Sequence, residues 1–253
     1  MIYAKLRIVK YLFVLCTFST AVAQEFASYF NNCQLGTDNF DHCLRTALND
    51  IRPFFKTGLP KYGIESFDPF FQKLVVLKRG SPSMNFVLSL KDVYESGWTF
   101  SKITNLKTDF KNNKMQYSQT FPDKYLNGHY ELVGNILGNK INNSGLWNLT
   151  LNDYVQTTTI TRIPRKTENG TLVYDTPIKV SIKYDTTRDM KLYISNLVRG
   201  RELLSNMVNN IINSSWRIGI LFVRPFIDEL VSTAFTDIFT RNLQYFPFNE
   251  IIH

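Results

Sequence analysis

Three cysteines are the first candidates for chemistry in this chain of 253 residues. Cys16 lies in an apolar N-terminal segment, whereas Cys33 and Cys43 follow it and are separated by nine residues. An even pair of cysteines in a secreted chain forms a disulfide by default. Two thiols without a neighbouring group of histidines or further cysteines do not make a zinc site. We therefore predict a Cys33–Cys43 disulfide and no metal.

The sequence has few of the residues and motifs that are typical of catalytic sites. The sequence holds three histidines, and it has no G-x-S-x-G elbow, no P-loop and no H-E-x-x-H. His129 and Glu131 share one face of a predicted strand, but alternation places Tyr130 and Leu132 on the opposite, apolar face. We interpret the pair as solvated rather than as an acid–base site. The chain is predicted to be no enzyme, with no catalytic residue and no cofactor.

The N-terminus predicts secretion. Three basic residues precede an apolar run over residues 11–22, which ends in the small-x-small pattern Ala21-Val22-Ala23. The run is about a dozen residues long, short of the roughly 20 that cross a bilayer, so a retained anchor is the weaker alternative. We predict a signal peptide over 1–23, cleavage before Gln24, and one ligand-binding domain over 24–253. Four glycosylation sequons agree with this route, at Asn142, Asn148, Asn169 and Asn213.

The net charge and its distribution limit the classes of partner that we expect. It is +8 for the whole chain and +5 without Lys5, Arg7 and Lys10, and the remaining basic residues are interleaved with acidic ones. This distribution argues against nucleic acid. We expect no stable membrane insertion, and we interpret the basic surface as solvated.

The middle of the chain has the period of β-strands. Apolar residues alternate with polar ones from Met84 to Leu90, from Leu172 to Tyr184, and in shorter runs near Met115, Tyr130 and Met190. Short polar turns separate these runs, which predicts an antiparallel meander with one apolar face. A short helix over about 41–56 is expected before it.

The last quarter of the chain predicts a long helix. From Arg201 to Leu243 the helical pattern is apolar almost all round, which requires that other elements cover it. A helix of this length spans roughly 60 Å, and Pro225 should kink it. A narrow polar stripe follows helical spacing, and we interpret it as the solvent side; its members are Asn206, Asn210, Asn213, Arg217, Arg224 and Asp228. The fold class is therefore predicted as α+β, a long C-terminal helix wrapped by a strongly curved antiparallel sheet, with a disulfide-stapled helix at the N-terminus.

Several motifs resemble those of the insect takeout and juvenile-hormone-binding-protein family. The opening resembles the family's in Cys33, Cys43-Leu44, Ile51-Arg52-Pro53, Gly58-Leu59-Pro60, Gly63-Ile64 and Asp68-Pro69. The middle is similar in Thr120-Phe121-Pro122, Gly128-x-Tyr130 and Gly134-x-Ile136-Leu137, and the end in Asn213-Ser214-Ser215-Trp216 through Pro225 to Phe246-Pro247-Phe248. The resemblance implies a fold related to the tubular lipid-binding proteins. It also implies a secreted carrier of a small hydrophobic ligand, such as juvenile hormone or a fatty-acid-like lipid, held in an internal tunnel. Takeout-like members, the branch we favour, are linked to feeding, circadian output, chemosensation and behaviour.

Inward positions of the strands and helix are the candidates for lining such a tunnel. They are Phe86, Leu88, Phe100, Tyr117, Tyr130, Leu132 and Ile136 on the strands, and Trp216, Ile220, Val223, Phe226, Ile227 and Leu230 on the helix. Tyr117 and Tyr130 are the candidates for a hydrogen bond to a ligand head group, because a phenol brings a donor to an apolar wall. The alternative is a secreted glycoprotein whose interior is plain core and which acts through an unidentified receptor.

Overall fold

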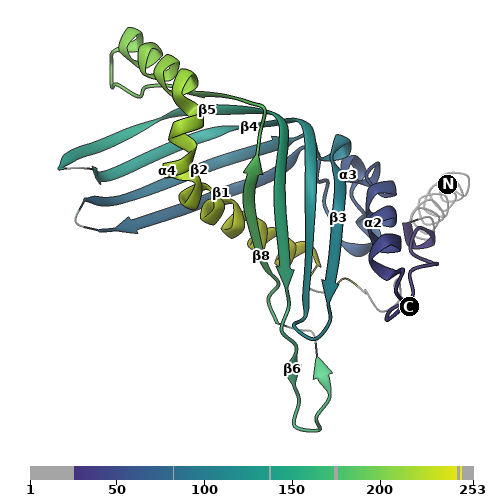
Figure 1. Ribbon diagram of the computed structural model, residues 1–253. Coiled ribbons are helices and arrows are strands. Elements are labelled where there is room, and N and C mark those ends of the chain that lie inside the picture. Colours follow the sequence, from purple (N-terminus) through teal and green to yellow (C-terminus); the bar gives the residue numbers. More distant parts are fainter. Residues whose placement is uncertain (1–25, 82, 137, 174–175, 244–245, 247–253) are drawn as a thin grey trace, which may run out of the picture.

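The computed structural model describes residues 26–81, 83–136, 138–173, 176–243 and 246, and is an α+β fold (Figure 1). A seven-stranded antiparallel sheet carries the order β1-β2-β4-β5-β8, with β3 beside β4 and β9 beside β5. Its strands are β1 (Phe70–Gly80), β2 (Met84–Ser96), β3 (Lys102–Asp109), β4 (Lys114–Ile136), β5 (Asn139–Thr161), β8 (Lys179–Thr186) and β9 (Asp189–Ile194). The helices are α2 (Phe40–Asp50), α3 (Phe54–Thr57), the 3₁₀ turns η1 (Pro60–Tyr62) and η2 (Trp98–Phe100), and α4 (Glu202–Leu243).

The long strands β4 and β5 bend near their middle. Burial alternates along β4 up to Phe121, is interrupted at Pro122 and Asp123, and resumes with Lys124 one position out of phase. The paired segment of β5 shifts in the same way around Asp153, which has a positive φ of 48°. Such irregularities increase local twist and curvature. The sheet is therefore divided into two halves that lie at an angle to one another (Figure 1).

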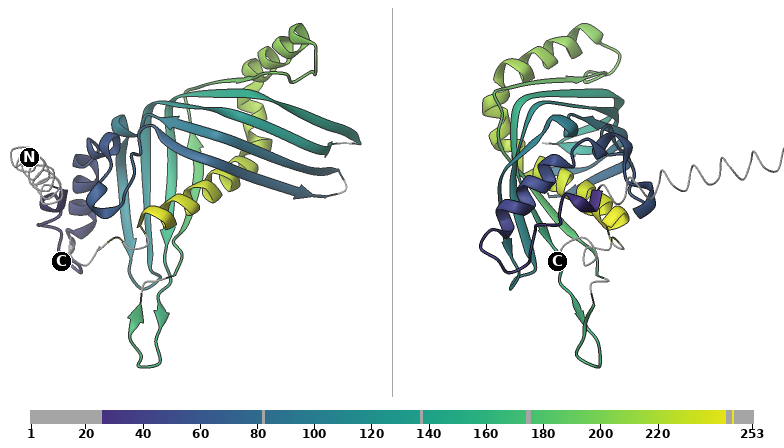
Figure 2. Two further views of the ribbon diagram at one scale, coloured as in Figure 1. Left: turned by 180° about the vertical axis from the view of Figure 1, so that it is seen from behind. Right: turned by 90° about the vertical axis from the view of Figure 1, so that its right-hand side faces the viewer.

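The second half of α4 bridges the two edges of the sheet. On one flank, Asp228, Ser232 and Thr236 accept hydrogen bonds from backbone N–H groups of β8, at 2.8–3.0 Å. On the other flank, Glu229 pairs with Arg79 of β1, and Arg241 donates to Gln72 of the same strand at 2.8 Å. The sheet and this part of α4 thus close into a roll, in which the strands curve over the helix (Figure 2).

The first half of α4 continues the same contact along β9. Asn209 and Asn213 each accept from the N–H and donate to the C=O of one strand residue, Ile194 and Leu192 respectively. The spacing of the helix residues matches that of the strand residues. Four residues of a helix rise about 6.0 Å, and two residues of a strand rise about 6.6–6.8 Å. Polar side chains four apart on the helix therefore meet alternate residues of the sheet edge. This edge ladder satisfies backbone groups that an open edge strand leaves unpaired.

The edge ladder corrects one sequence-based interpretation. Asn206 and Asn210 are exposed as expected, but Asn213 and Asp228 of the predicted solvent stripe bond to the sheet edge. Arg217 also donates to the carbonyl of Arg188, in the turn between β8 and β9, although its side chain stays exposed. The reason is that a helix lying along a sheet edge needs polar side chains on its buried side. A polar residue of this helix therefore need not face solvent.

Two element boundaries also differ from expectation. The single N-terminal helix is two helices, because residues 51–53 form a turn that ends at Pro53. The predicted strand from Leu172 to Tyr184 is two strands. β7 (Leu172–Val173) pairs with β6 (Arg165–Lys166), while β8 begins only after Pro177, which lacks the N–H that a ladder needs.

The predicted disulfide and the long C-terminal helix are confirmed. Cys33 and Cys43 form a disulfide with their Cα atoms 5.4 Å apart. α4 is one continuous helix that contains Pro225 and curves along its length (Figures 1 and 2). The kink expected at Pro225 itself stays a prediction. Among the described residues, none of the helices is apolar enough over a sufficient length to cross a membrane.

Candidate functional site

The apolar side of the sheet faces α4, and we call it the inner face. Register fixes its members, because Leu88 pairs with Leu132 and Leu90 with Tyr130 across β2 and β4. The row continues into β5 at Trp147 and Leu149. Leu88, Leu90, Leu132, Trp147 and Leu149 are all only partly buried. Apolar surface that remains partly open on a concave sheet is the chemistry expected for a hydrophobic ligand.

The helix supplies the facing wall. Phe226 lies where α4 crosses β1, with the Arg79 guanidinium 4.8 Å from its ring centroid. Ile220, Phe226, Ile227 and Leu230 are partly buried, and Trp216 is fully buried. Five of the six helix residues predicted to line the site are therefore at least partly buried, whereas Val223 is 45% exposed.

A buried ion pair lies at the end of the inner face, where the two halves of the sheet meet. The Lys124 ammonium lies 2.7 Å from a carboxylate oxygen of Glu95, and both side chains are 5% exposed. The ammonium also donates to Gln156 at 3.2 Å. It is surrounded by three aromatic rings, with centroids at 4.1 Å for Phe121, 4.6 Å for Trp98 and 5.0 Å for Tyr154. Such cation–π contacts are favourable for a desolvated ammonium.

The electrostatics of this pair follow from burial. Desolvation lowers the pKa of Lys124, and the negative charge of Glu95 opposes that shift. The pKa of Tyr154 is raised, first by burial and then by the carboxylate of Glu95. The ion pair is thus held inside an otherwise apolar core made by Phe70, Trp98, Phe121, Leu151, Tyr154, Ile178, Val180, Ile182, Phe235 and Ile238. This packed core bounds the inner face on one side.

Tyr130 lies on the inner face as predicted. Its hydroxyl donates to the carbonyl of Ser195 at 2.7 Å, and burial raises its pKa. The hydroxyl oxygen can still accept a hydrogen bond. Tyr130 therefore remains a candidate for contact with a ligand head group, with its ring held in place by the loop after β9.

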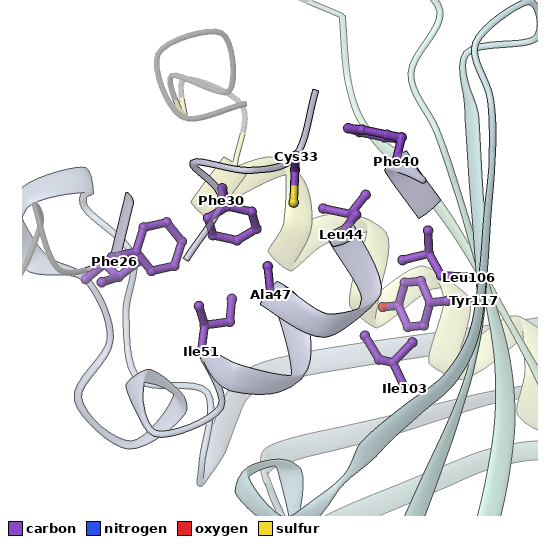
Figure 3. Packing of buried hydrophobic residues seen from close by; sticks show 11 residues of the cluster. Phe26, Phe30, Cys33, Phe40, Leu44, Ala47, Ile51, Ile103, Leu106 and Tyr117 are labelled. Carbon is purple, nitrogen blue, oxygen red and sulfur yellow. The ribbon is translucent and has the colours of Figure 1, made fainter. Parts of the chain in front are cut away.

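Tyr117 lies in a different part of the molecule. It packs with Leu44, Ile103 and Leu106 in the core between α2 and the β3–β4 ribbon (Figure 3). Burial raises its pKa to about 12, and a hydrogen bond with Thr158 opposes the shift. Tyr117 and Tyr130 therefore do not lie in the same site, and the surroundings of Tyr117 are those of a core residue.

Three other predicted lining residues are placed as follows. Phe100, in η2, is 68% exposed and lies beside the Lys56 ammonium rather than on the inner face. Phe86 is partly buried and borders an open groove of about 420 Å³ at the far ends of β2, β4 and β5, together with Gly134 and Ile141. The side chain of Ile136 lies outside the described part of the structure.

The comparisons with known proteins identify the family. The sequence profile of "Haemolymph juvenile hormone binding protein (JHBP)" matches residues 12–253. The chain belongs to this family. Membership of the JHBP family places it among binding proteins rather than enzymes.

One curated relative and two solved structures are similar to this JHBP-family chain. The chain is 23% identical over 236 residues to the circadian clock-controlled protein daywake of Drosophila melanogaster, which covers 90% of this chain and 88% of that protein. The crystal structure of Takeout 1 from Epiphyas postvittana matches with a TM-score of 0.62 and 21% identity, over 84% of this chain and 96% of that one. Lipopolysaccharide binding protein matches with a TM-score of 0.30 and 11% identity, over 81% of this chain and 39% of that one. The Takeout 1 match shows that this JHBP-family chain has the takeout fold.

Sequence reasoning missed the Lys124–Glu95 pair. The backbone at Asp92 has a positive φ of 50° and β2 shifts its register between Lys91 and Tyr94, which turns Glu95 inward. The interruption at Pro122 does the same for Lys124. Pro122 was the one available signal, because a proline inside a strand marks an irregular position.

The four sequons lie in different surroundings. Asn142, Asn148 and Asn169 are exposed, the last in the turn between β6 and β7. Asn213 is engaged in the edge ladder through both atoms of its amide. The predicted signal peptide over 1–23 lies outside the described residues.

Proposed function

We propose that this protein is a secreted carrier that binds a small hydrophobic ligand non-covalently between the inner face and α4. Membership of the JHBP family supports a binding role. The observation that carries the proposal is the row of partly open apolar side chains along β2, β4 and β5, facing a helix wall of the same character. The disulfide supports passage through an oxidising compartment.

Affinity follows from apolar burial. A terpenoid or an acyl chain that hides roughly 300–400 Å² of apolar surface gains on the order of 7–10 kcal/mol before the costs of immobilisation. No covalent step is needed. The chemical class proposed is therefore an elongated, mainly apolar molecule, either a terpenoid such as juvenile hormone or a fatty-acid-like lipid.

Tyr130 is the residue we propose for contact with the polar end of the ligand. Its phenol lies on the inner face and is held by a hydrogen bond to the carbonyl of Ser195. Removing the hydroxyl with Tyr130→Phe should weaken binding of a ligand that carries a carboxyl or ester by several fold, because one hydrogen bond contributes about 0.5–1.5 kcal/mol. An unchanged dissociation constant would exclude this role.

The proposal is tested by titration with a fluorescent fatty acid. Leu132 and Val133 are neighbours in β4 that point to opposite faces, so they provide a matched pair. Leu132→Glu should weaken binding at least about tenfold, because a charge on the inner face opposes burial of an apolar chain. Val133→Glu, on the exposed outer face, should bind as the unmodified protein does. Equal binding by both variants, or no uptake of the probe, would favour a plain core and a protein that acts through a receptor.

A further inference from the structure

An apolar stripe runs along the first half of α4 on the side away from the sheet. It consists of Leu203, Met207, Ile211, Ile218, Leu221 and Phe222, which are between 59% and 82% exposed. At 3.6 residues per turn these six side chains project within a sector of about 100°. A set of large apolar residues gathered on one exposed face marks a site of interaction.

The sheet cannot cover this stripe. Ser205, Asn209 and Asn213 bond to β9 and the residues after it, and they lie on the opposite side of the helix. The hydrogen bonds of the edge ladder fix the rotation of α4, so the stripe stays directed outward. The first half of α4 also extends beyond the strands (Figures 1 and 2). The stripe is therefore separate from the inner face and from the proposed ligand.

Basic residues lie at one end of the stripe and along its flank. Between residues 188 and 224 the chain has six basic and two acidic residues. Arg199 and Arg201 are exposed just before the helix begins, and Arg217 is exposed along its flank. A one-sided apolar helix face bordered by arginines is the pattern of a helix that lies in the interface of a membrane with anionic lipids.

We propose that the first half of α4 docks on the surface of anionic membranes, with the apolar stripe inserted among the lipids and the flanking arginines on the headgroups. We expect the lipid surface to cover the stripe, rather than a second copy of the chain, because the flanking arginines complement the charge of anionic headgroups. Docking would place the protein against a membrane without crossing it.

The test is sedimentation of the full chain with vesicles of phosphatidylcholine, with and without phosphatidylserine. The protein should bind vesicles that contain phosphatidylserine, and added salt should weaken the binding. The double variant Leu221→Ser/Phe222→Ser should lose at least about tenfold in partitioning, because each large apolar side chain withdrawn from water contributes on the order of a factor of ten. Arg199→Glu/Arg201→Glu should reduce binding to the anionic vesicles only.

Ile163→Ser is the matched control, because Ile163 is 69% exposed and lies outside the stripe. It should bind vesicles like the unmodified protein. No binding to phosphatidylserine vesicles, or equal binding by Leu221→Ser/Phe222→Ser, would overturn the proposal. It would also be overturned if light scattering showed a dimer that this double variant dissociates, since a second copy would then cover the stripe. Fatty-acid uptake is measured separately, so failure here leaves the proposed carrier function standing.

Discussion

At the scale of single residues, the Lys124–Glu95 pair is the most unusual feature of the interior. Both groups are almost fully buried, and three aromatic rings and Gln156 complete the surroundings of the ammonium. Burying two charges is costly, and their mutual attraction offsets that cost only while both are present. The pair should therefore respond very differently to loss of one partner and to loss of both.

Lys124→Met should lower the free energy of unfolding by about 3–5 kcal/mol, because it leaves the Glu95 carboxylate buried without a partner. Lys124→Met/Glu95→Leu should recover most of this loss, because both charges are then gone. Urea denaturation followed by circular dichroism measures both. A single variant as stable as the unmodified protein would show that the pair is hydrated or open.

Tyr117 gives a prediction on alkaline stability. Its pKa in the folded protein is about 12 against an ordinary value of 10, so the folded state disfavours the phenolate. The associated stability is complete below pH 10 and is lost as the pH rises from 10 to 12, by about 3 kcal/mol for a shift of this size. Tyr117→Phe should remove this part of the alkaline loss in urea titrations at several pH values. Tyr125→Phe, an exposed position, is the control and should leave the pH profile unchanged.

At the scale of elements, α4 acts as the partner of two sheet edges. Its length and the position of Pro225 could be read from the sequence, and so could its apolar character. The direction of its polar side chains could not, because spacing alone does not say whether an asparagine faces water or a strand edge. Asn209 and Asn213 show the difference, since each satisfies one N–H and one C=O of β9.

Asn209→Leu should lower the free energy of unfolding by about 2–3 kcal/mol, because both backbone groups of Ile194 lose their partner. The amide of Ile194 should also exchange faster with deuterium. Asn206→Leu, three residues earlier and exposed, is the matched control and should change stability by less than about 0.5 kcal/mol. Equal effects of the two variants would contradict the edge ladder.

The contacts of α4 predict which of the sequons carry a glycan. The side-chain nitrogen of Asn213, the atom that would be glycosylated, donates to the carbonyl of Leu192 at 2.8 Å, so a glycan there would disrupt the ladder. Asn169 lies in an exposed turn and should be modified. Peptide mapping by mass spectrometry of the protein from a secreting eukaryotic host should find glycan at Asn169 and none at Asn213. An occupied Asn213 in folded protein would exclude the described contact.

At the scale of the whole molecule, the sequence predicted the α+β class, the disulfide and the antiparallel sheet with its long helix. It did not predict that polar side chains of α4 bond to both edges of the sheet, because such contacts depend on the register of distant strands. That the predicted residues line a ligand site stays a prediction, but Leu88, Tyr130 and Leu132 came to lie on the inner face, and Phe226 on the part of α4 that crosses β1. Phe100 and Tyr117 did not, because strand alternation holds only within one regular strand: Phe100 lies in a 3₁₀ turn and Tyr117 in the other half of the sheet.

The two apolar surfaces of the molecule have separate proposed roles. We propose the inner face, which lies on the concave side of the sheet, for a small molecule, and the exposed apolar stripe of α4 for a membrane surface. Because they lie on different sides of α4, substitutions in one should leave the function of the other intact.

Native mass spectrometry of the secreted, folded protein can show whether the inner face holds a small hydrophobic molecule. We predict a species heavier than the chain by the mass of one small apolar molecule, released on collisional activation and absent from Leu132→Glu but retained by Val133→Glu. A spectrum that shows only the bare chain, before and after incubation with fatty acids and terpenoids, would contradict the proposed carrier function.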